Sequence, residues 1–121
     1  MPKILYLVTE DWFFASHFLP MARAAREAGL NVAVATRIHQ HQGQISAEGI
    51  RLVAYDSSRS SVSVVRGLRE LLQTFSIVRR ERPDIIHCIA LRPVVFGGLV
   101  ARCLGIKAVV LAPTGLGHLW I

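Results

Sequence analysis

A loop near the N-terminus, residues 9–17, gathers side chains that could bind a ligand and move a proton. The carboxylates of Glu10 and Asp11 can accept hydrogen bonds from hydroxyl groups or act as a general base. The ring of Trp12 and its two phenylalanine neighbours can form an apolar wall. The imidazole of His17 can donate or accept a hydrogen bond near neutral pH. These groups suit a ligand that is rich in hydroxyl groups or amphiphilic.

The loop contains no glycine, so it lacks the fingerprint that lets backbone approach a pyrophosphate. Ser16 is a suitable N-cap for the helix predicted next. His17 would then lie in the first helical turn, where the helix dipole disfavours the protonated imidazole. Simpler interpretations stay open. The carboxylates could be solvated charges beside a helix N-terminus, and the aromatic rings could pack on the sheet edge or on another domain.

Two later stretches also hold candidate ligand contacts. His87 lies near the end of an apolar run, and Arg92 precedes Pro93 at a predicted helix start. Arg92 could offer its guanidinium to a phosphate or a carboxylate. The third stretch is Thr114-Gly115-Leu116-Gly117-His118, a glycine-containing loop with available backbone amides. The alternatives are a buried core histidine at position 87 and a solvated surface arginine at position 92.

Strand and helix signals alternate along the whole chain. The pattern of apolar residues, glycines and prolines predicts the boundaries of these elements. Strands are expected over residues 3–9, 31–36, 50–55, 84–89 and 107–112, and helices over 16–28, 44–47, 63–82 and 92–104. Gly29 and Gly105 follow two of the helices, in the position that favours a left-handed residue.

This alternation predicts an α/β fold, a Rossmann-like doubly wound parallel sheet with strand order 3-2-1-4-5 and helices on both faces. The first, fourth and fifth strands are nearly continuous apolar runs, which indicates burial on both faces. Ligands bind such sheets beyond the carboxyl ends of the strands, where the strand order reverses. The three stretches described above would meet at that edge.

The helix predicted over 63–82 is amphipathic and basic. Its apolar residues recur at spacings of three and four and predict one stripe that packs on the sheet. The stripe consists of Val65, Leu68, Leu71, Leu72, Phe75 and Val78, and the arginines outside it are Arg66, Arg69, Arg79, Arg80 and Arg82. A basic amphipathic helix can also lie on an anionic membrane. The simpler interpretation is that the arginines are solvated.

Composition narrows the class of protein. With 121 residues, of which 52% are hydrophobic and 18% charged, the chain can fold as one domain with a real core. No apolar run is long enough to span a membrane or to serve as a signal peptide, so a cytoplasmic protein is expected.

Cys88 and Cys103 lack the spacing of a metal site and are expected to be buried thiols. His39 and His41 are too few to predict a metal site either.

The net charge of +6 would allow nucleic acid, anionic lipid or phosphorylated partners. The chain has no signature of a nucleic-acid-binding module, and its basic residues are not interleaved with aromatic residues. Nucleic acid is therefore not expected as a partner.

Taken together, the motifs resemble the N-terminal half of family 4 glycosyltransferases of the GT-B fold. The resemblance rests first on the loop residues, on Ser16-His17 and on Ala28-Gly29. It continues through Arg82-Pro83-Asp84-Ile85-Ile86-His87, Leu91-Arg92-Pro93, Gly97-Gly98 and Thr114-Gly115-Leu116-Gly117-His118-Leu119-Trp120. It covers nearly the whole chain.

The resemblance implies that residues 1–121 are a single acceptor-side domain and that a C-terminal donor-binding domain is absent from this chain. Such enzymes transfer a hexose or N-acetylhexosamine from a nucleotide-diphosphate sugar, with retention at the anomeric carbon and no obligatory metal or other cofactor. Their acceptors are often lipid-linked glycans. A peripheral position at the cytoplasmic face of the inner membrane, in contact with anionic lipid, is therefore expected.

The candidate catalytic residues are His17 and Asp11. The candidate substrate contacts are Glu10, Trp12, Ser16, His87, Arg92, Thr114, Gly115 and His118. The sequence departs from the family in two places. Many members have a glycine-rich loop after the first strand, where this chain has residues 10–17. Many also have a histidine after the fifth strand, where Thr114 stands in this chain and His118 follows four residues later.

Two other functions are kept as alternatives. One is a non-catalytic subunit that recruits a catalytic chain to the membrane. The other is a nucleotide-dependent enzyme such as a dehydrogenase. The latter is disfavoured because the chain has no GxGxxG motif and no acidic residue at the end of the second predicted strand.

Overall fold

The computed structural model describes residues 2–10, 14–16, 18–38, 42–55, 64–89, 91–106 and 108–112. They form a five-stranded parallel sheet in the order β3-β2-β1-β4-β5, as predicted. The strands are β1 (Lys3–Glu10), β2 (Asn31–Arg37), β3 (Arg51–Ala54), β4 (Ile85–Ile89) and β5 (Ala108–Ala112). The helices between them are α2 (Leu19–Glu27), α3 (Gln42–Ser46), α4 (Val64–Glu81) and α5 (Leu91–Leu104).

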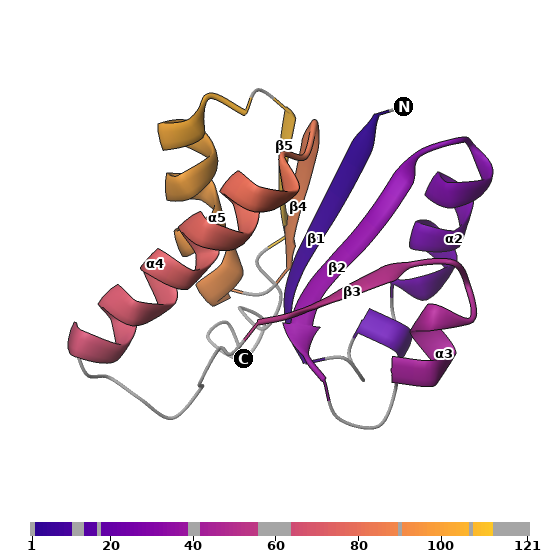
Figure 1. The fold of residues 1–121 in the computed structure, drawn as a ribbon, viewed down its shortest axis with the longest axis horizontal. Coiled ribbons are helices and arrows are strands. Elements are labelled where there is room, and N and C mark those ends of the chain that lie inside the picture. The colour runs from indigo at the N-terminus through magenta and orange to yellow at the C-terminus, as the bar shows by residue number, and fades with distance from the viewer. Residues whose placement is uncertain are drawn as a thin grey trace, which may run out of the picture.

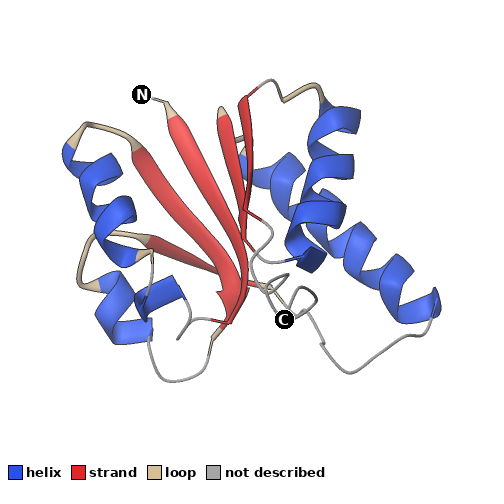
Figure 2. Ribbon diagram, turned by 180° about the vertical axis from the view of Figure 1, so that it is seen from behind, coloured by secondary structure: helices blue, strands red, loops and turns tan. Residues whose placement is uncertain are grey.

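Helices cover both faces of the sheet. Helices α2 and α3 lie on one side, and α4 and α5 lie on the other (Figure 1). The same two layers are seen from behind in Figure 2. Successive side chains of a strand point to opposite faces. Tyr6 and Val8 therefore join the core beneath α2, while Leu5 and Leu7 join the core beneath α4 and α5. The central strand β1 is thus buried from both sides.

The glycines predicted to end helices do so. Gly29 has φ +97° after α2, and the amide of Leu30 donates to the carbonyl of Ala25, which satisfies a free carbonyl of the last turn. Gly105 has φ +74° after α5. Helix α4 ends differently, because Arg82 itself adopts a positive φ of 48° and Pro83 follows it.

The start of α2 differs from the prediction. The helix begins at Leu19, not at residue 16, and its N-cap is Phe18, whose side chain makes no capping hydrogen bond. Residues 14–16 form a separate helical turn in which Ser16 is exposed. Ser16 is therefore not the N-cap of α2. Pro20 lies in the first turn of the helix, where its fixed φ is favourable, and this position is compatible with a start at Leu19.

Two predictions about burial are wrong. Strand β5 is not buried on both faces, because Val110 and Leu111 are each about half exposed on the edge of the sheet. Its apolar run reflects edge packing against β4 and α5, not a central position. Cys103, on the solvent side of α5, is exposed, whereas Cys88 on β4 is buried as expected.

The apolar stripe of α4 packs only in part. Ile77 and Val78 are buried, but Leu68 is 57% exposed and Leu72 is 62% exposed. Polar residues occupy the buried side of the helix in their place. These are Glu70, Thr74 and Glu81. Of the five stripe residues whose side chains are described, Leu71, Phe75 and Val78 pack on the core, whereas Leu68 and Leu72 face away from it.

Helix α5 approaches the sheet closely at one glycine. A methyl group added at Gly97 would lie 2.5 Å from the sulfur of Cys88 and 2.8 Å from Cδ1 of Leu7. Both atoms belong to buried side chains of the sheet, so neither can move freely. The next residue, Gly98, has only Leu111 Cδ2 nearby, at 3.9 Å.

We predict that Gly97→Ala lowers the free energy of unfolding by about 1–3 kcal/mol, because α5 must move away from β1 and β4. The matched variant Gly98→Ala should be neutral or stabilising by up to about 1 kcal/mol, since alanine favours helix and its methyl group meets no obstacle. Chemical denaturation of the two variants and the unchanged protein measures both values. Equal stability of the two variants would contradict the close approach.

Candidate ligand site at the carboxyl ends of the strands

The strand order reverses at β1, which pairs with β2 on one side and β4 on the other. Because all strands are parallel, the carboxyl ends of β1, β2 and β4 share one edge of the sheet. The register between β1 and β2 shifts between Leu7 and Glu10. Bulges of this kind often redirect side chains next to binding sites. We therefore expect the predicted crevice at this edge, after the irregular end of β1.

Three candidate residues are described at or next to this edge. Glu10 is the last residue of β1 and its backbone lies opposite Arg37. Arg92 is the second residue of α5, which begins two residues after β4 ends. Ser16 is exposed in the helical turn that precedes α2. The fold thus brings the first two predicted stretches to one edge, although they are far apart in sequence.

The remaining candidates, except His87, lie outside the described residues and stay predictions. They are Asp11, Trp12, His17, Thr114, Gly115 and His118. Among the residues that the structure describes, no group of three or more His, Cys, Asp or Glu side chains is arranged to hold a metal ion.

His87 lies in the middle of β4, directly opposite Tyr6 of β1. The two ring centroids are 5.1 Å apart, and the ring of Phe18 contacts His87 edge-on at 6.0 Å. The residue is only 7% exposed. Burial lowers the pKa of the imidazole below its usual 6.5, which favours the neutral form. In this chain His87 behaves as one ring of an aromatic cluster.

The aromatic cluster anchors the chain on both sides of His17. Phe14 contacts Tyr6 edge-on at 5.3 Å, and Phe18 contacts His87. Tyr6 and Phe14 are fully buried. Phe14 and Phe18 themselves are therefore held to the sheet by ring contacts with β1 and β4. This arrangement gives His87 an indirect way to support the site, by positioning Phe18 at the start of α2. Direct contact between His87 and a ligand remains a prediction.

Sequence reasoning did not single out two hydroxyl groups at this edge. Thr9 and Thr36 are buried near the carboxyl ends of β1 and β2. The hydroxyl of Thr36 donates to the carbonyl of Arg37, at 3.3 Å. The sequence could have indicated these hydroxyl groups, because each threonine lies at or near the end of an apolar strand.

Cys88, next to His87, faces the opposite side of the sheet, and burial raises the pKa of its thiol to about 12. It is therefore not a nucleophile at neutral pH.

Two hollows in the described part of the chain lie at the other end of the sheet. One is lined mainly by arginines near the C-terminal end of α4. The other, of about 300 Å³, lies between the C-terminal ends of α4 and α5. Neither includes a predicted ligand contact. In the part of the chain that is described, no helix is long and apolar enough to cross a membrane.

The lowered pKa of His87 predicts how the free energy of unfolding depends on pH. Below about pH 6.5 the unfolded chain binds a proton at this histidine that the folded chain resists, so the free energy of unfolding falls as the pH falls. His87→Phe keeps a ring against Tyr6 and Phe18 but removes the titration. The variant should therefore gain stability relative to the unchanged protein between pH 7 and pH 5, as measured by denaturant unfolding. Stability curves that stay parallel over this range would contradict the lowered pKa.

Comparison with known proteins identifies the family of the chain. The family model described as "Glycosyl transferase 4-like" matches residues 3–119. No match is found among curated proteins. Solved structures that share the fold are distant in sequence. The chain spans about a third of the length of several of them, and 90% of the length of a C-terminal domain of the PF1911 hydrogenase from Pyrococcus furiosus, which is 11% identical with a TM-score of 0.66.

Three of these structures illustrate the likeness. MurG of Acinetobacter baumannii is 19% identical with a TM-score of 0.65, over 91% of this chain and 33% of that chain. A putative UDP-N-acetylglucosamine 2-epimerase from Listeria monocytogenes is 15% identical with a TM-score of 0.68, over 94% and 32%. MnaA of S. aureus, solved with UDP, is 18% identical with a TM-score of 0.69, over 96% and 30%.

Such likenesses show a common fold, which glycosyltransferases, a putative epimerase and a hydrogenase domain share, and do not by themselves distinguish reactions. The family assignment rests on the sequence model, which spans nearly the whole chain. The chain belongs to the glycosyl transferase 4-like family.

Proposed function

We propose that this chain is the N-terminal, acceptor-binding domain of a retaining glycosyltransferase. The enzyme transfers a hexose or N-acetylhexosamine from a nucleotide-diphosphate sugar to a lipid-linked glycan. The observation that carries the proposal is that the central strand β1 pairs with β4, which leads into α5, in a domain of this family. Doubly wound folds bind their ligands beyond the carboxyl ends of such strands, where the strand order reverses.

The donor is assigned to a second domain, C-terminal to this chain. The structures of MurG and MnaA are about three times as long as this chain, a length that would accommodate such a domain. One of them was solved with UDP, and another, the glycosyltransferase VinC, was solved in complex with DTDP. These complexes support a nucleotide sugar as the donor class.

In the proposed reaction the bond from the anomeric carbon to the nucleotide diphosphate breaks and a bond from that carbon to the acceptor oxygen forms. The acceptor hydroxyl loses its proton, and we propose His17 or Asp11 as the general base that takes it. Glu10, Trp12, Ser16 and Arg92 would hold the acceptor from the β1 and β4 sides. His87 would support them from within β4, and Thr114, Gly115 and His118 would contribute from the loop after β5.

The proposed location is the cytoplasmic face of the inner membrane, where the protein would be held peripherally. A lipid-linked acceptor presents its glycan at that surface, so an enzyme that works there benefits from a membrane contact. The alternative, a non-catalytic subunit that recruits a separate catalytic chain, predicts that the full-length protein transfers no sugar by itself.

We predict that His17→Ala in the full-length protein lowers kcat/KM for the acceptor by about 10²–10⁴-fold, the usual effect of losing a general base. The control is Glu27→Ala, which removes an exposed charge at the far end of α2. Radiolabelled nucleotide sugars and a lipid-linked acceptor provide the assay. NMR of the product should show the anomeric configuration of the donor retained.

Three outcomes count against parts of this proposal. Unchanged transfer by His17→Ala would remove the role given to the loop after β1. An inverted product would exclude the retaining mechanism. Absence of transfer with every nucleotide sugar, together with activity on adding a second chain from the same cell, would favour the recruiting subunit.

A further inference from the structure

We propose that the C-terminal ends of α4 and α5 form a second binding site, for a small soluble organic phosphate that carries an apolar group. Arg79 and Arg82 would bind the phosphate, and an apolar hollow beside them would hold the rest of the ligand. The inference does not rest on the proposed function, because this site lies at the opposite end of the sheet from the candidate acceptor crevice. A ligand bound here would leave that crevice free.

Two neighbouring hollows at this end of the molecule have a pair of arginines in common. We call them the arginine-lined hollow, of about 680 Å³, and the apolar hollow, of about 300 Å³. The first is lined by Phe75, Ser76, Arg79, Arg80 and Arg82. The second is lined by Val78, Arg79, Arg82, Pro83, Leu104 and Ile106. Arg79 and Arg82, which we call the shared arginines, therefore border a polar space and an apolar space at once.

The end of α5 builds one wall of the apolar hollow. Gly105 adopts a left-handed φ of 74°, and the amide of Ile106 donates to the carbonyl of Ala101 at 2.9 Å. This turn returns the chain to the core, where Leu104 and Ile106 pack against buried residues. Because both side chains belong to the packed core, the wall has a fixed shape.

The end of α4 places Arg82 at the edge of the hollow in an unusual backbone conformation. Its φ is +48°, its amide donates to the carbonyl of Val78 at 2.9 Å, and Pro83 follows it. Glycine adopts a positive φ readily, whereas most other residues are strained by it. The arginine therefore supplies a guanidinium group to the hollow at a position where glycine would be the less strained residue.

The charge of the shared arginines is not neutralised within the described part of the chain. Neither forms an ion pair with a described residue. The carboxylates nearest to them in the chain are bound elsewhere. Glu81 is paired with Lys3 at 3.1 Å and with Arg51. Asp84 accepts a hydrogen bond from the backbone amide of Lys3 at 2.8 Å. The positive charge is therefore available to an anionic ligand.

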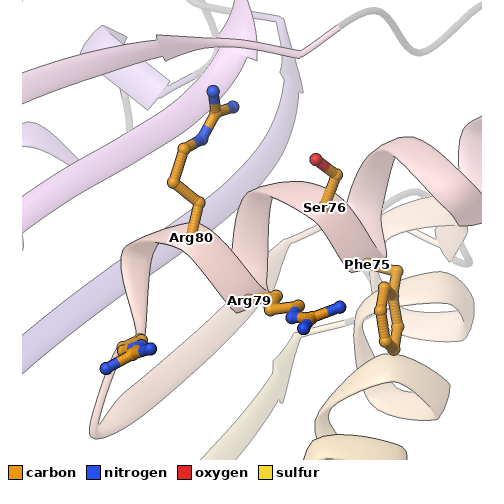
Figure 3. A pocket seen from close by; sticks show the side chains of 5 residues that line it. Phe75, Ser76, Arg79 and Arg80 are labelled. Carbon is orange, nitrogen blue, oxygen red and sulfur yellow. The ribbon is translucent and has the colours of Figure 1, made fainter.

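The arrangement of the arginines favours a phosphate. Figure 3 shows Arg79 lying along α4 toward Phe75, while Arg80 and Ser76 project from another side. Arg80 is therefore not assigned to the site. A phosphate ester carries up to two negative charges near neutral pH and has three terminal oxygens, so it can accept hydrogen bonds from two guanidinium groups at once. A carboxylate, with two oxygens, is satisfied by a single guanidinium fork.

The apolar hollow suits a small apolar group. Its volume of about 300 Å³ is at the lower end of the range found for ligand pockets. An aromatic ring or a short alkyl chain attached to the phosphate would contact its apolar wall. Carboxylates, imidazoles and thiols are absent from the described residues that line either hollow. The site would therefore bind its ligand without transforming it.

Titration with phenyl phosphate, followed by NMR of methyl groups, tests the proposal. The methyl signals of Val78, Leu104 and Ile106 should shift. Phenyl phosphate should bind severalfold more tightly than methyl phosphate or inorganic phosphate, because its ring fills the apolar hollow. Phenol, which lacks the phosphate, should cause no comparable shift. Equal affinity for inorganic phosphate and phenyl phosphate, or shifts confined to other methyl groups, would overturn the proposal.

Substitution of Arg82 separates this site from a general attraction of anions to the helix. In Arg82→Gly the affinity for phenyl phosphate should fall about tenfold, as expected for the loss of a charged hydrogen-bond donor. The variant should stay folded, because glycine tolerates the positive φ. The matched control is Arg69→Gln, which removes an exposed arginine from the first half of the same helix. Its affinity should match that of the unchanged protein, and equal losses in the two variants would overturn the proposal.

Two adjacent arginines supply a sharper test. Arg79→Gln should weaken the binding of phenyl phosphate about tenfold, because it removes one of the two guanidinium contacts. Arg80→Gln changes the net charge equally, but its side chain projects from another side, so it should have only the smaller effect of a nearby screened charge. Circular dichroism confirms that each variant is folded. A larger loss in Arg80→Gln than in Arg79→Gln would overturn the assignment of the shared arginines.

Discussion

The orientation of α4 about its own axis depends on the buried carboxylate of Glu81. This side chain is 8% exposed and is paired with Lys3 at the start of β1 and with Arg51 of β3. A buried charge that loses its partners is strongly destabilising, so the helix cannot rotate away from these contacts.

Earlier in the same helix, the hydroxyl of Thr74 donates to the carbonyl of Glu70 at 2.8 Å and lies 2.9 Å from the hydroxyl of Tyr55. These polar contacts occupy the side of α4 that faces the sheet, and the exposure of Leu68 and Leu72 follows from them.

The two helical layers are fastened to the sheet in different ways. Helix α5 is close-packed, because Gly97 leaves no room for a side chain above Cys88 and Leu7. Helix α4 is held mainly by its C-terminal half, where Ile77, Val78 and Glu81 are buried. On the other face, α2 is held near its start by rings from Phe14 and Phe18. Rigid attachment therefore lies beside the loop after β1, which is a suitable foundation for a site that must hold an acceptor in a fixed position.

The sequence alone was sufficient to predict the order of the strands, because apolar runs, amphipathic segments and helix-ending glycines are local signals. It was not sufficient to predict the rotation of α4. Helical periodicity identifies an apolar side, but Glu81 is bound by Lys3, which is 78 residues away, and such pairs leave no local trace. The exposure of β5 was missed for a related reason, since an apolar run does not reveal whether a strand lies at an edge.

For the site, chain order and topology placed Glu10 and Arg92 at one edge. The surroundings of His87 depended on Tyr6 and Phe18, whose contacts no motif predicts.

The direction of α4 relates its exposed leucines to the acceptor edge. The helix follows β3 and precedes β4, so it begins at the carboxyl edge of the parallel sheet and ends at the opposite edge. Leu68 and Leu72 lie in its first half, nearer the edge where β1 and β4 end. The arginines at positions 79, 80 and 82 lie at the far end. The polar contacts that orient α4 therefore leave an exposed apolar pair on the half of the helix that is nearer the proposed acceptor edge, and exposed positive charge on the half that is farther from it.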